Sequence, residues 1–319
     1  MHEFQLINRY FLELSKKNKS SLNLNDDVFF DKAKKLVVSV DTYVEGVHFI
    51  NFKKPELIIK KIIRSSISDI ICKGVRPRYY FISGSGNKKT FSPSNLKKIS
   101  KSLKQEQNKY NIFLCGGDTV YSNKLSFTVT SIGFSSKIIF RNKAKLNDDI
   151  YVTGNLGDSF TGLNILKKKI NTNKSLRKYF EHKYYQPDLF LNFSNKLLSF
   201  AHTSIDISDG LIADLEKLIN KQKFSYEIRL SDIPISRNLK KLIGQKKLNK
   251  ISYISQGDDY QILFTASSSK SRIINKTAKS LGIKISKIGK ICSNQLKSQI
   301  IDKKGDKIAI KTKGYSHRF

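Results

Sequence analysis

The sequence predicts an α/β or α+β chain of two domains, and three observations lead to this fold class. Short runs of β-branched and aromatic residues alternate with segments of helical period along the chain. The length of 319 residues is enough for two domains of ordinary size. A polar and basic stretch at residues 135–149 interrupts the alternation. We therefore expect an N-terminal domain at residues 1–138 and a C-terminal domain at residues 139–319.

The expected elements follow from local composition. Residues 55–73 are expected to form a helix because Pro stands in the first turn and Gly74 follows the last. Residues 209–221 are expected to form another, with four apolar side chains on one face. Seven apolar, β-branched runs are expected to be strands. In chain order these strands are 36–40, 111–115, 126–134, 150–153, 203–207, 224–230 and 261–266.

The formal net charge of +33 leaves two interpretations open. A basic surface is typical of proteins that bind nucleic acid or anionic membranes. Compositional bias is the other explanation, because the basic residues are spread along the chain and only ten of the 59 are Arg. Bidentate contacts to phosphates and bases favour Arg. We therefore favour bias and expect no specific nucleic-acid partner, although a basic surface would still steer an anionic nucleotide.

The cysteines and the N-terminus bear on the cellular compartment. The three cysteines are widely spaced and include no C-x-x-C pair, which argues against a disulfide framework or a zinc site and fits a reducing cytosol. The N-terminal residues do not resemble a signal peptide. No apolar run approaches the length of a membrane span. We expect a cytoplasmic protein with no membrane partner.

Several carboxylates stand at the ends of apolar runs, beside Gly, Ser or Thr. Carboxylates that meet at neighbouring strand ends repel one another unless cations lie between them. Mg²⁺ takes oxygen ligands, often one or two carboxylates together with nucleotide phosphates. The set therefore predicts a multi-metal phosphate site, although any one Asp taken alone is better explained as a turn or helix cap. The residues are Asp26, Asp27, Asp41, Asp118, Asp206, Asp209, Asp258 and Asp259.

Asp69 adds an independent argument. At 100° per residue it falls inside the broad isoleucine face of the helix predicted at residues 55–73, together with Ser66. A carboxylate on a buried face must be paired or bound to a metal to stay ionised. A metal and an Arg or Lys partner both remain open as explanations.

Three glycine-containing segments bear on phosphate binding. Residues 116–118 (GGD) follow an apolar run, so backbone N–H groups there could approach a phosphate closely. Residues 153–163 are expected to be a structural strand-to-helix turn, and the GSG at 84–86 a loop. The chain contains neither a G-x-x-x-x-G-K-[ST] P-loop nor the H-R-D and D-F-G kinase motifs. Any ATP chemistry must use another phosphate-binding design.

A series of motifs along nearly the whole chain is typical of one known protein family. D-T-x-V-E-G-x-H-F at 41–49 and I-D-x-S-D-G-L at 205–211, in this order, are highly specific together. Further motifs are EFQLINRYF at 3–11, SDIICKGVRPRY at 68–79, GGDT at 116–119, YVTGNLGDS at 151–159, GDDYQILFT at 257–265 and KGYSHRF at 313–319. With these motifs the chain resembles the thiamine-monophosphate kinase family, in the superfamily of aminoimidazole ribonucleotide synthase.

The resemblance implies two α/β domains whose N-terminal sheets pair across a homodimer. It implies transfer of a phosphoryl group from ATP to thiamine monophosphate, with several Mg²⁺ ions and no general base. By matching position, it places ATP contacts at Gly117, Asp118, Arg141 and Ser208, with Tyr110 a weaker candidate, and substrate contacts at His48, Asp258 and Tyr315. It places metal ligands at Asp27, Ser39, Val40 (through a backbone oxygen), Asp41, Asp69, Asp118, Asp206 and Asp209.

Residue chemistry alone would treat some of these positions differently. His48 would be a packed, hydrogen-bonded imidazole, and Tyr315 and His317 would belong to a frayed tail. The sequence also departs from the usual family pattern, since Asp258 stands where Glu is common and Val40 where Thr is common. Two other functions remain open: an ATP-dependent, amidine-forming purine synthase of the same superfamily, and a basic nucleic-acid-binding protein without activity.

Overall fold

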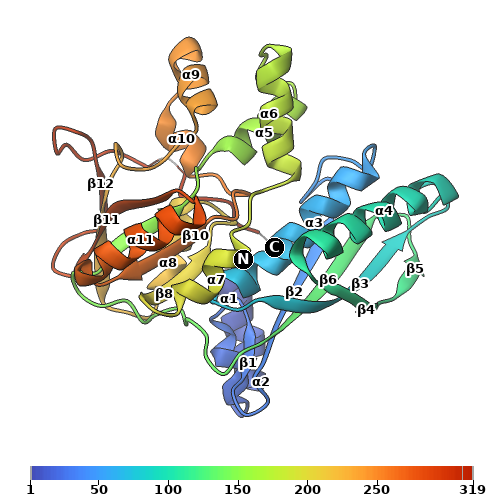
Figure 1. Cartoon of the computed structure of the whole chain (residues 1–319), viewed down its shortest axis with the longest axis horizontal. Helices are drawn as coiled ribbons and strands as arrows, with labels where there is room; N and C mark the ends of the chain where they lie inside the picture. Colours follow the sequence, from blue (N-terminus) through green and yellow to red (C-terminus); the bar gives the residue numbers. More distant parts are fainter. Residues whose placement is uncertain (1, 311, 318–319) are drawn as a thin grey trace.

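The structure is a computed structural model and describes residues 2–310 and 312–317. Those residues contain two six-stranded sheets lying beside each other, with helices packed on both (Figure 1). The N-terminal sheet has the order β1-β2-β6-β3-β4, and β5 continues beside β3 where β4 ends. Its strands are β1 (Phe29–Asp31), β2 (Leu36–Val44), β3 (Pro77–Gly86), β4 (Phe113–Gly116), β5 (Thr119–Tyr121) and β6 (Ser126–Phe134).

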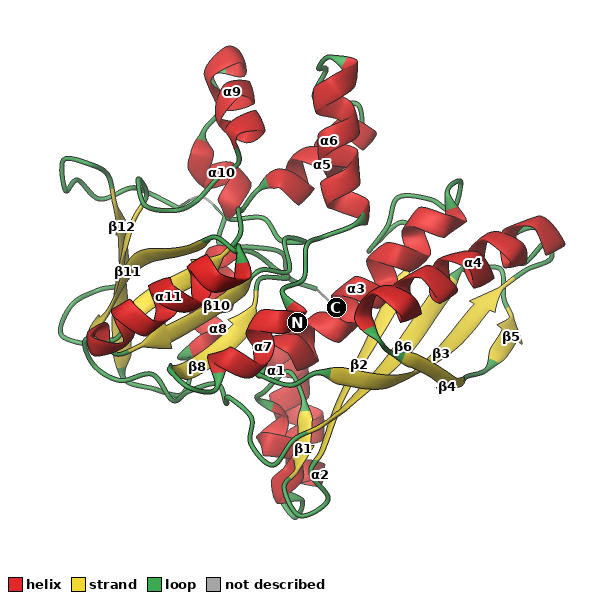
Figure 2. Ribbon diagram, viewed as in Figure 1, coloured by secondary structure: helices red, strands yellow, loops and turns green. Residues whose placement is uncertain are grey.

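Two long helices, α3 (Pro55–Cys72) and α4 (Pro93–Tyr110), cover one face of this sheet (Figure 2). Pro begins α3 where its missing N–H would have no partner anyway, and isoleucines such as Ile62 and Ile67 fill the space against the sheet. In the antiparallel register Asp41 lies opposite Val129, and Val129 lies opposite Ile82. This register sets how far apart the polar side chains of different strands lie.

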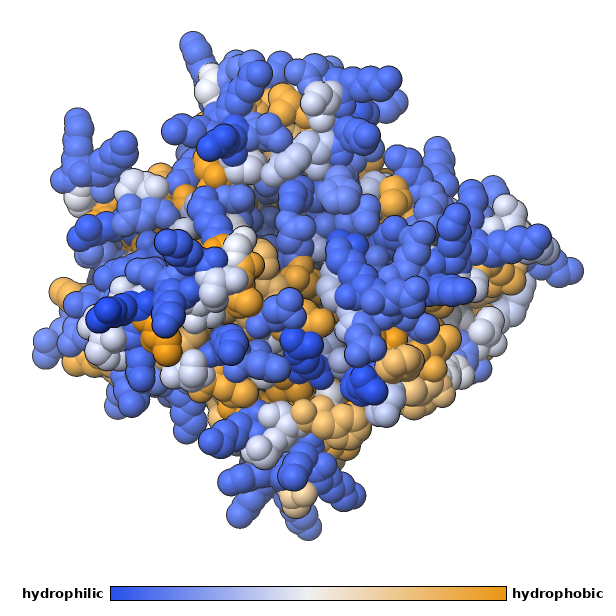
Figure 3. Space-filling model, viewed as in Figure 1, coloured by the Kyte–Doolittle hydropathy of each residue, from blue (hydrophilic) through white to orange (hydrophobic). Residues whose placement is uncertain are grey.

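The other face of the N-terminal sheet has no helix over it in the described residues. By register, six large apolar side chains share this face, and their exposed fractions range from 36% to 61%. Figure 3 shows apolar side chains gathered below α4, over β4 and β6. We call this surface the apolar sheet face, and it is formed by Val40, Tyr79, Phe81, Phe113, Val120 and Phe134.

The C-terminal sheet has the order β12-β9-β11-β7-β10-β8 and is antiparallel except for the β12–β9 pair. Its core is built from buried aliphatic residues such as Ile205, Leu211 and Leu263. Its strands are β7 (Asp149–Thr153), β8 (Ala201–Asp206), β9 (Phe224–Arg229), β10 (Ile262–Ala266), β11 (Ile285–Ser293) and β12 (Gln299–Ile301).

The remaining helices lie around this sheet and at the N-terminus. Two pairs, α5 with α6 and α9 with α10, project from the same side of the molecule (Figure 1). They are α5 (Asp158–Leu166), α6 (Lys174–Tyr185), α7 (Leu191–Leu197), α8 (Leu211–Leu218), α9 (Arg237–Lys246), α10 (Lys250–Ile254), η3 (Ser268–Lys270) and α11 (Ser271–Leu281). The N-terminal segment contains α1 (Glu3–Leu6), η1 (Ile7–Phe11), α2 (Leu12–Ser15) and η2 (Lys19–Leu24). None of the helices among the described residues is long and apolar enough to cross a membrane.

The α/β class, both expected helices and all seven expected strands are confirmed, and all of these elements except β6 have shifted ends. The expected loop at residues 84–86 was wrong, because these residues end β3 and pair with β5 and β6. A Cβ on Gly84 would lie 3.1 Å from the ring of Phe91 and 3.4 Å from that of Phe127, so small residues are needed for packing there. The division at residues 138 and 139 stays a prediction.

Candidate active site

Three of the predicted aspartates meet where the two sheets adjoin. Asp41 lies on β2, on the side of the strand that faces α3. Asp69 lies in the last turn of α3, and Asp206 is the last residue of β8. We call this group the aspartate trio. Residues from three distant parts of the chain therefore form one cluster, as the sequence predicted for these members.

The trio consists of crowded carboxylates, of which Asp206 is buried and Asp41 and Asp69 are half-buried. Burial raises the pKa of Asp41 to about 7, against hydrogen bonds from Ser66 and Tyr43. Burial, together with the nearby negative charges of Asp41 and Asp206, raises the pKa of Asp69 well above its usual range. Burial and the charge of Asp214 raise the pKa of Asp206 to about 7, with Asp41 adding to the effect. The three carboxylates therefore disfavour one another's ionisation.

Unpartnered oxygens test whether a cation fits this group. Oδ2 of Asp41 and Oδ2 of Asp206 are buried and have no hydrogen-bond partner in the part of the chain that the structure describes. Buried polar atoms are rarely left in this state. A hard cation would satisfy both oxygens and remove the repulsion. The donors present, carboxylates with the hydroxyl of Ser39 hydrogen-bonded to Asp69, are the oxygen ligands that Mg²⁺ prefers.

Protein side chains alone do not complete a metal site. Among the described residues, no three His, Cys, Asp or Glu side chains are arranged so that they could hold a metal ion. Mg²⁺ is commonly bound by one or two carboxylates, with substrate phosphates and water supplying the other ligands. The trio therefore fits a site that needs a phosphorylated ligand for its completion.

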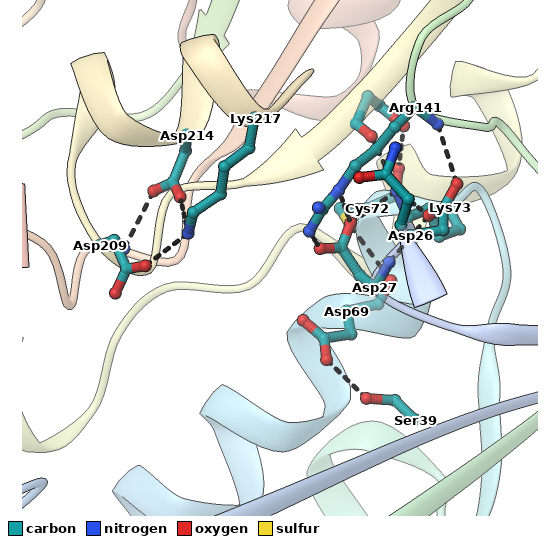
Figure 4. A network of polar contacts seen from close by, with 12 residues as sticks. Asp26, Asp27, Ser39, Asp69, Cys72, Lys73, Arg141, Asp209, Asp214 and Lys217 are labelled. Atoms are coloured by element: carbon teal, nitrogen blue, oxygen red, sulfur yellow. Dashed lines mark hydrogen bonds and ion pairs between the residues drawn. The ribbon is translucent and has the colours of Figure 1, made fainter. Parts of the chain in front are cut away.

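A second group joins Asp26 and Asp27 to two buried cations (Figure 4). The Nζ of Lys73 lies 2.7 Å from Asp26 Oδ1 and 2.6 Å from Asp27 Oδ2. Arg141 pairs with Asp27 through Nη2, and its Nε donates to Asp27 Oδ2 at 3.2 Å. Burial opposes the charge on Lys73, but Asp26 outweighs it, so the pKa of Lys73 is raised. Asp27 and Arg141, a predicted metal ligand and a predicted ATP contact, bind each other here.

A third group contains Asp209, which Figure 4 shows apart from the group around Asp27. Lys217 pairs with Asp209 and lies 2.9 Å from Asp214 Oδ1. Asp214 is fully buried and also accepts the N–H groups of Asp209 and Gly210 at 2.9 and 3.0 Å. Asp209 is therefore not an N-cap, because Gly210 holds that position in α8. The neighbouring Ser208 accepts the N–H of Asp258 through its carbonyl oxygen at 2.8 Å.

The GGD motif lies away from these groups. Asp118 is exposed between β4 and β5 at the edge of the N-terminal sheet, and its Oδ1 accepts the N–H of Thr119 at 2.7 Å. A Cβ on Gly117 would stand 1.8 Å from the carbonyl oxygen of Ile82, so only Gly fits this position. Tyr110 is buried at the end of α4. The predicted ligand position Val40 carries its side chain on the apolar sheet face.

The predicted substrate residues come together with the chain's C-terminal tail. Val44 N–H donates to His48 Nδ1 at 3.0 Å, so the neutral ring carries its proton on Nε2. The His48 ring lies 5.5 Å from that of His317, which lies 5.0 Å from that of Tyr315. The tail docks on α8, where Tyr315 N–H donates to Asp209 O at 2.9 Å. The tail is therefore ordered over the site rather than frayed; residues 318 and 319 of the motif lie outside the described residues.

A cavity of about 310 Å³ opens between α8, the tail and α1. Asp209, Lys217 and Tyr315 line it. His2 Nδ1 and Ser316 Oγ lie 3.2 Å apart, so the two ends of the chain meet at its rim. This cavity places the third carboxylate group beside Tyr315, one of the predicted substrate residues.

Sequence reasoning missed the buried cations that hold these groups. Lys73 falls about 60° around α3 from Ile58, inside the same face as Asp69, so the helical pattern contained a signal for it. Lys217 stands three residues after Asp214, which is a common spacing for a helical ion pair. Lys61, which pairs with Asp258, lies outside the isoleucine face and gave no such signal.

Comparison with known proteins agrees with this geometry. Residues 25–135 match the family model described as AIR synthase related protein, N-terminal domain. The chain is 35% identical to the thiamine-monophosphate kinase of Buchnera aphidicola subsp. Acyrthosiphon pisum (strain APS), over 99% of this chain and 98% of that protein. The chain belongs to the thiamine-monophosphate kinase family.

Solved structures of thiamine-monophosphate kinases share the fold. The structure of AaThiL complexed with AMPPCP and TMP is similar with a TM-score of 0.84 and 26% identity, over 99% of this chain and 97% of that chain. The thiamine-monophosphate kinase from Stenotrophomonas maltophilia K279a is similar with a TM-score of 0.78 and 26% identity, over 96% and 98% of the two chains. The expected family and its aminoimidazole ribonucleotide synthase-like fold are thus confirmed.

Proposed function

We propose that this protein is an ATP-dependent kinase that converts thiamine monophosphate to thiamine diphosphate. Its family membership supports this function, as does its likeness over the whole chain to AaThiL, which was solved with AMPPCP and TMP. The observation that carries the proposal is the aspartate trio with its buried, unpartnered oxygens. Cations bound beside phosphates would satisfy these oxygens and remove the repulsion between the carboxylates. The three cysteines are free thiols, which agrees with a cytoplasmic enzyme.

The residues of this chain would bind and orient two anions rather than move a proton. A phosphate monoester has its second pKa near ~6, so the acceptor oxygen is already ionised at neutral pH and needs no general base. Mg²⁺, when bound, would neutralise the charge on the reacting phosphates. We expect Asp41, Asp69 and Asp206 to supply one or two carboxylates to each ion, with phosphate oxygens and water as the other ligands. Asp27, Ser39, the Val40 backbone, Asp118 and Asp209 are the further expected ligands.

The nucleotide contacts follow from the positions of cations and free backbone groups. Arg141 presents a planar guanidinium next to Asp27, which suits a phosphate as well as a carboxylate. Gly117 lets the chain approach a phosphate closely, because no side chain fits there. Ser208 and Tyr110 complete the expected set. On the acceptor side, His48 would donate through Nε2, with Asp258 and Tyr315 beside it.

We further propose that the active enzyme is a homodimer that shares its site between subunits. Neighbouring strands lie about 4.8 Å apart, and β6 and β3 separate β2 from the edge that carries β4 and β5. Asp41 and Asp118 of one chain are therefore about 14 Å apart across the sheet. One Mg²⁺ cannot bridge that separation, since its ligand oxygens lie at about 2.1 Å. A second copy on the apolar sheet face would bury its aromatic side chains, and we propose that its Asp118 completes the site.

Mixing two inactive variants tests the shared site. Asp41→Asn and Asp118→Asn should each abolish turnover as separate homodimers. After mixed refolding, about half of the dimers contain one copy of each, and one of their two sites has both aspartates intact. Recovery of about a quarter of wild-type activity is therefore expected. No recovery, in a sample shown to contain mixed dimers, would contradict the sharing.

The function itself is tested by direct assay. Purified protein with ATP, Mg²⁺ and thiamine monophosphate should form thiamine diphosphate and ADP in equal amounts. Omitting Mg²⁺ or replacing thiamine monophosphate by thiamine should abolish product. Formation of ADP only with a formylglycinamide-type purine precursor and an ammonia donor would instead support an amidine-forming synthase. Absence of thiamine diphosphate from folded, Mg²⁺-saturated protein would refute the proposal.

A further inference from the structure

Lys61 is a buried cation on α3 to which the proposed function described above assigns no role. Its side chain is 2% exposed, and its Nζ lies 2.8 Å from Asp258 Oδ1. The same Nζ lies 4.2 Å from the centre of the Tyr184 ring and 5.7 Å from that of Tyr260. It also donates to the carbonyl oxygen of Tyr184 at 3.4 Å. A buried ammonium persists only with such partners, so its position is strongly determined.

These contacts hold only one of the two oxygens of Asp258. Oδ1 takes both Lys61 Nζ and the hydroxyl of Tyr260, which donates at 3.1 Å. Burial and the charge of Asp258 raise the pKa of Tyr260 well above its usual range, so that hydroxyl remains a donor. Oδ2 has no hydrogen bond from the described residues and is not among their buried unpartnered atoms, and the Asp258 side chain is 26% exposed. Oδ2 is therefore the accessible oxygen.

The backbone around Asp258 is unusual and needs support. Asp258 and Tyr260 both have left-handed backbone angles, with φ of 69° and 52°. A bulky residue such as Tyr adopts this conformation only where the surroundings determine it. The N–H groups of Asp258 and Tyr260 donate to the carbonyl oxygens of Ser208 and Ile207, each at 2.8 Å. The turn is thus tied to the end of β8 by its backbone and to α3 by Lys61.

Asp258 and Lys61 both lie close enough to His48 to influence its charge. Burial and the charge of His317 lower the pKa of the His48 ring, while the charge of Asp258 raises it and that of Lys61 lowers it. His48 presents a proton on Nε2, and Asp258 presents an anionic oxygen. A donor beside a carboxylate oxygen suits a ligand that carries both a phosphate and a positively charged ring. Thiamine monophosphate, with its cationic thiazolium ring, is such a ligand.

We propose that Lys61 is a positioning residue for the acceptor substrate, which it orients by clamping Asp258 Oδ1 so that Oδ2 faces the thiazolium ring. This inference rests on the proposed kinase function. It also accounts for the short Asp258 side chain, because the ion pair with Lys61 fixes the orientation of the Asp258 carboxylate. Lys61 itself does not touch the substrate.

The test compares Lys61→Met with Lys60→Met, which removes a neighbouring lysine that has no ion pair in the described structure and is only partly buried. Both variants are assayed for KM of each substrate and for kcat. Lys61→Met should raise the KM for thiamine monophosphate about tenfold or more, because Asp258 loses its orientation. The KM for ATP and the kcat at saturating acceptor should stay within about twofold. Lys60→Met should resemble the wild type.

A second variant separates positioning from folding. Lys61→Met leaves a partly buried carboxylate without its cation and will lower the Tm. Lys61→Met with Asp258→Asn removes that uncompensated charge, so the Tm should recover, and the KM for thiamine monophosphate should equal that of Asp258→Asn alone because Lys61 acts only through Asp258. Return of this KM to the wild-type value together with the Tm would overturn the inference, as would an unchanged KM in Lys61→Met. Wild-type protein that forms no thiamine diphosphate would overturn the proposed function instead.

Discussion

Asp41→Asn should make the metal-free protein more stable while it abolishes turnover. Burial raises the pKa of Asp41 from 3.8 to about 7, a rise of about 3 pH units. Each unit corresponds to about 1.4 kcal/mol, so ionised Asp41 opposes folding by on the order of 4 kcal/mol at pH 8. An amide is uncharged but still polar and buried, so we expect a net gain of about half that, ~2 kcal/mol.

The direction in which this stability difference changes with pH tests the electrostatic explanation. Between pH 3.8 and about 7 the folded state binds the proton of Asp41 more tightly than the unfolded state does. Wild-type stability therefore falls as pH rises through this window, and the deficit is complete above it. The gain of Asp41→Asn should be present at pH 8 and should be nearly gone at about pH 4, where Asp41 is protonated in the folded state and about 40% protonated in the unfolded state.

The measurement is urea unfolding of the wild type and the variant in EDTA at both pH values. Asp306→Asn is the matched control, because Asp306 is exposed and has no side-chain partner in the described structure. Turnover at saturating Mg²⁺ should fall at least about 100-fold in Asp41→Asn only. Loss of stability in this variant at pH 8 would refute the electrostatic reasoning, and near-normal turnover would refute the metal-binding role.

Three further predictions concern the substrate residues and the glycines. Burial and the charge of His317 lower the pKa of His48, so the KM for thiamine monophosphate should not change with pH near neutrality and should rise only well below pH 6.5. His317→Gln should move this rise in KM to higher pH. An unchanged pH profile in that variant would contradict the contact between the two rings. Gly314→Ala places a Cβ 2.6 Å from the carbonyl oxygen of Asp209, so the C-terminal tail should dock less tightly and the KM for thiamine monophosphate should rise severalfold. The control Gly244→Ala places its Cβ in open space and should leave this KM unchanged. Gly117→Ala should abolish ATP binding measured by calorimetry, because its Cβ would stand 1.8 Å from Ile82 O; retained affinity would exclude a role in the site.

The prediction of the fold from sequence succeeded where local chemistry dominates. Helix α3 begins at Pro55 and ends before Gly74, as its terminal residues indicate. Strand β6 was predicted with the correct bounds because its alternating residues face a helix on one side only. Strand β3 was not predicted, since its glycines are those of a loop. Only the tertiary structure shows why glycines are needed there, because the ring of Phe91 packs against them.

The sequence by itself determined the family, the residue types of the site and the segments that carry them. Only the tertiary structure decided which carboxylates face one another, which are neutralised by Lys73 or Lys217, and that Asp118 stands apart from Asp41. The reason is physical. A motif reports the local backbone, whereas ion pairing, desolvation and repulsion depend on distances between different segments of the chain. Those distances are set by strand order and helix packing.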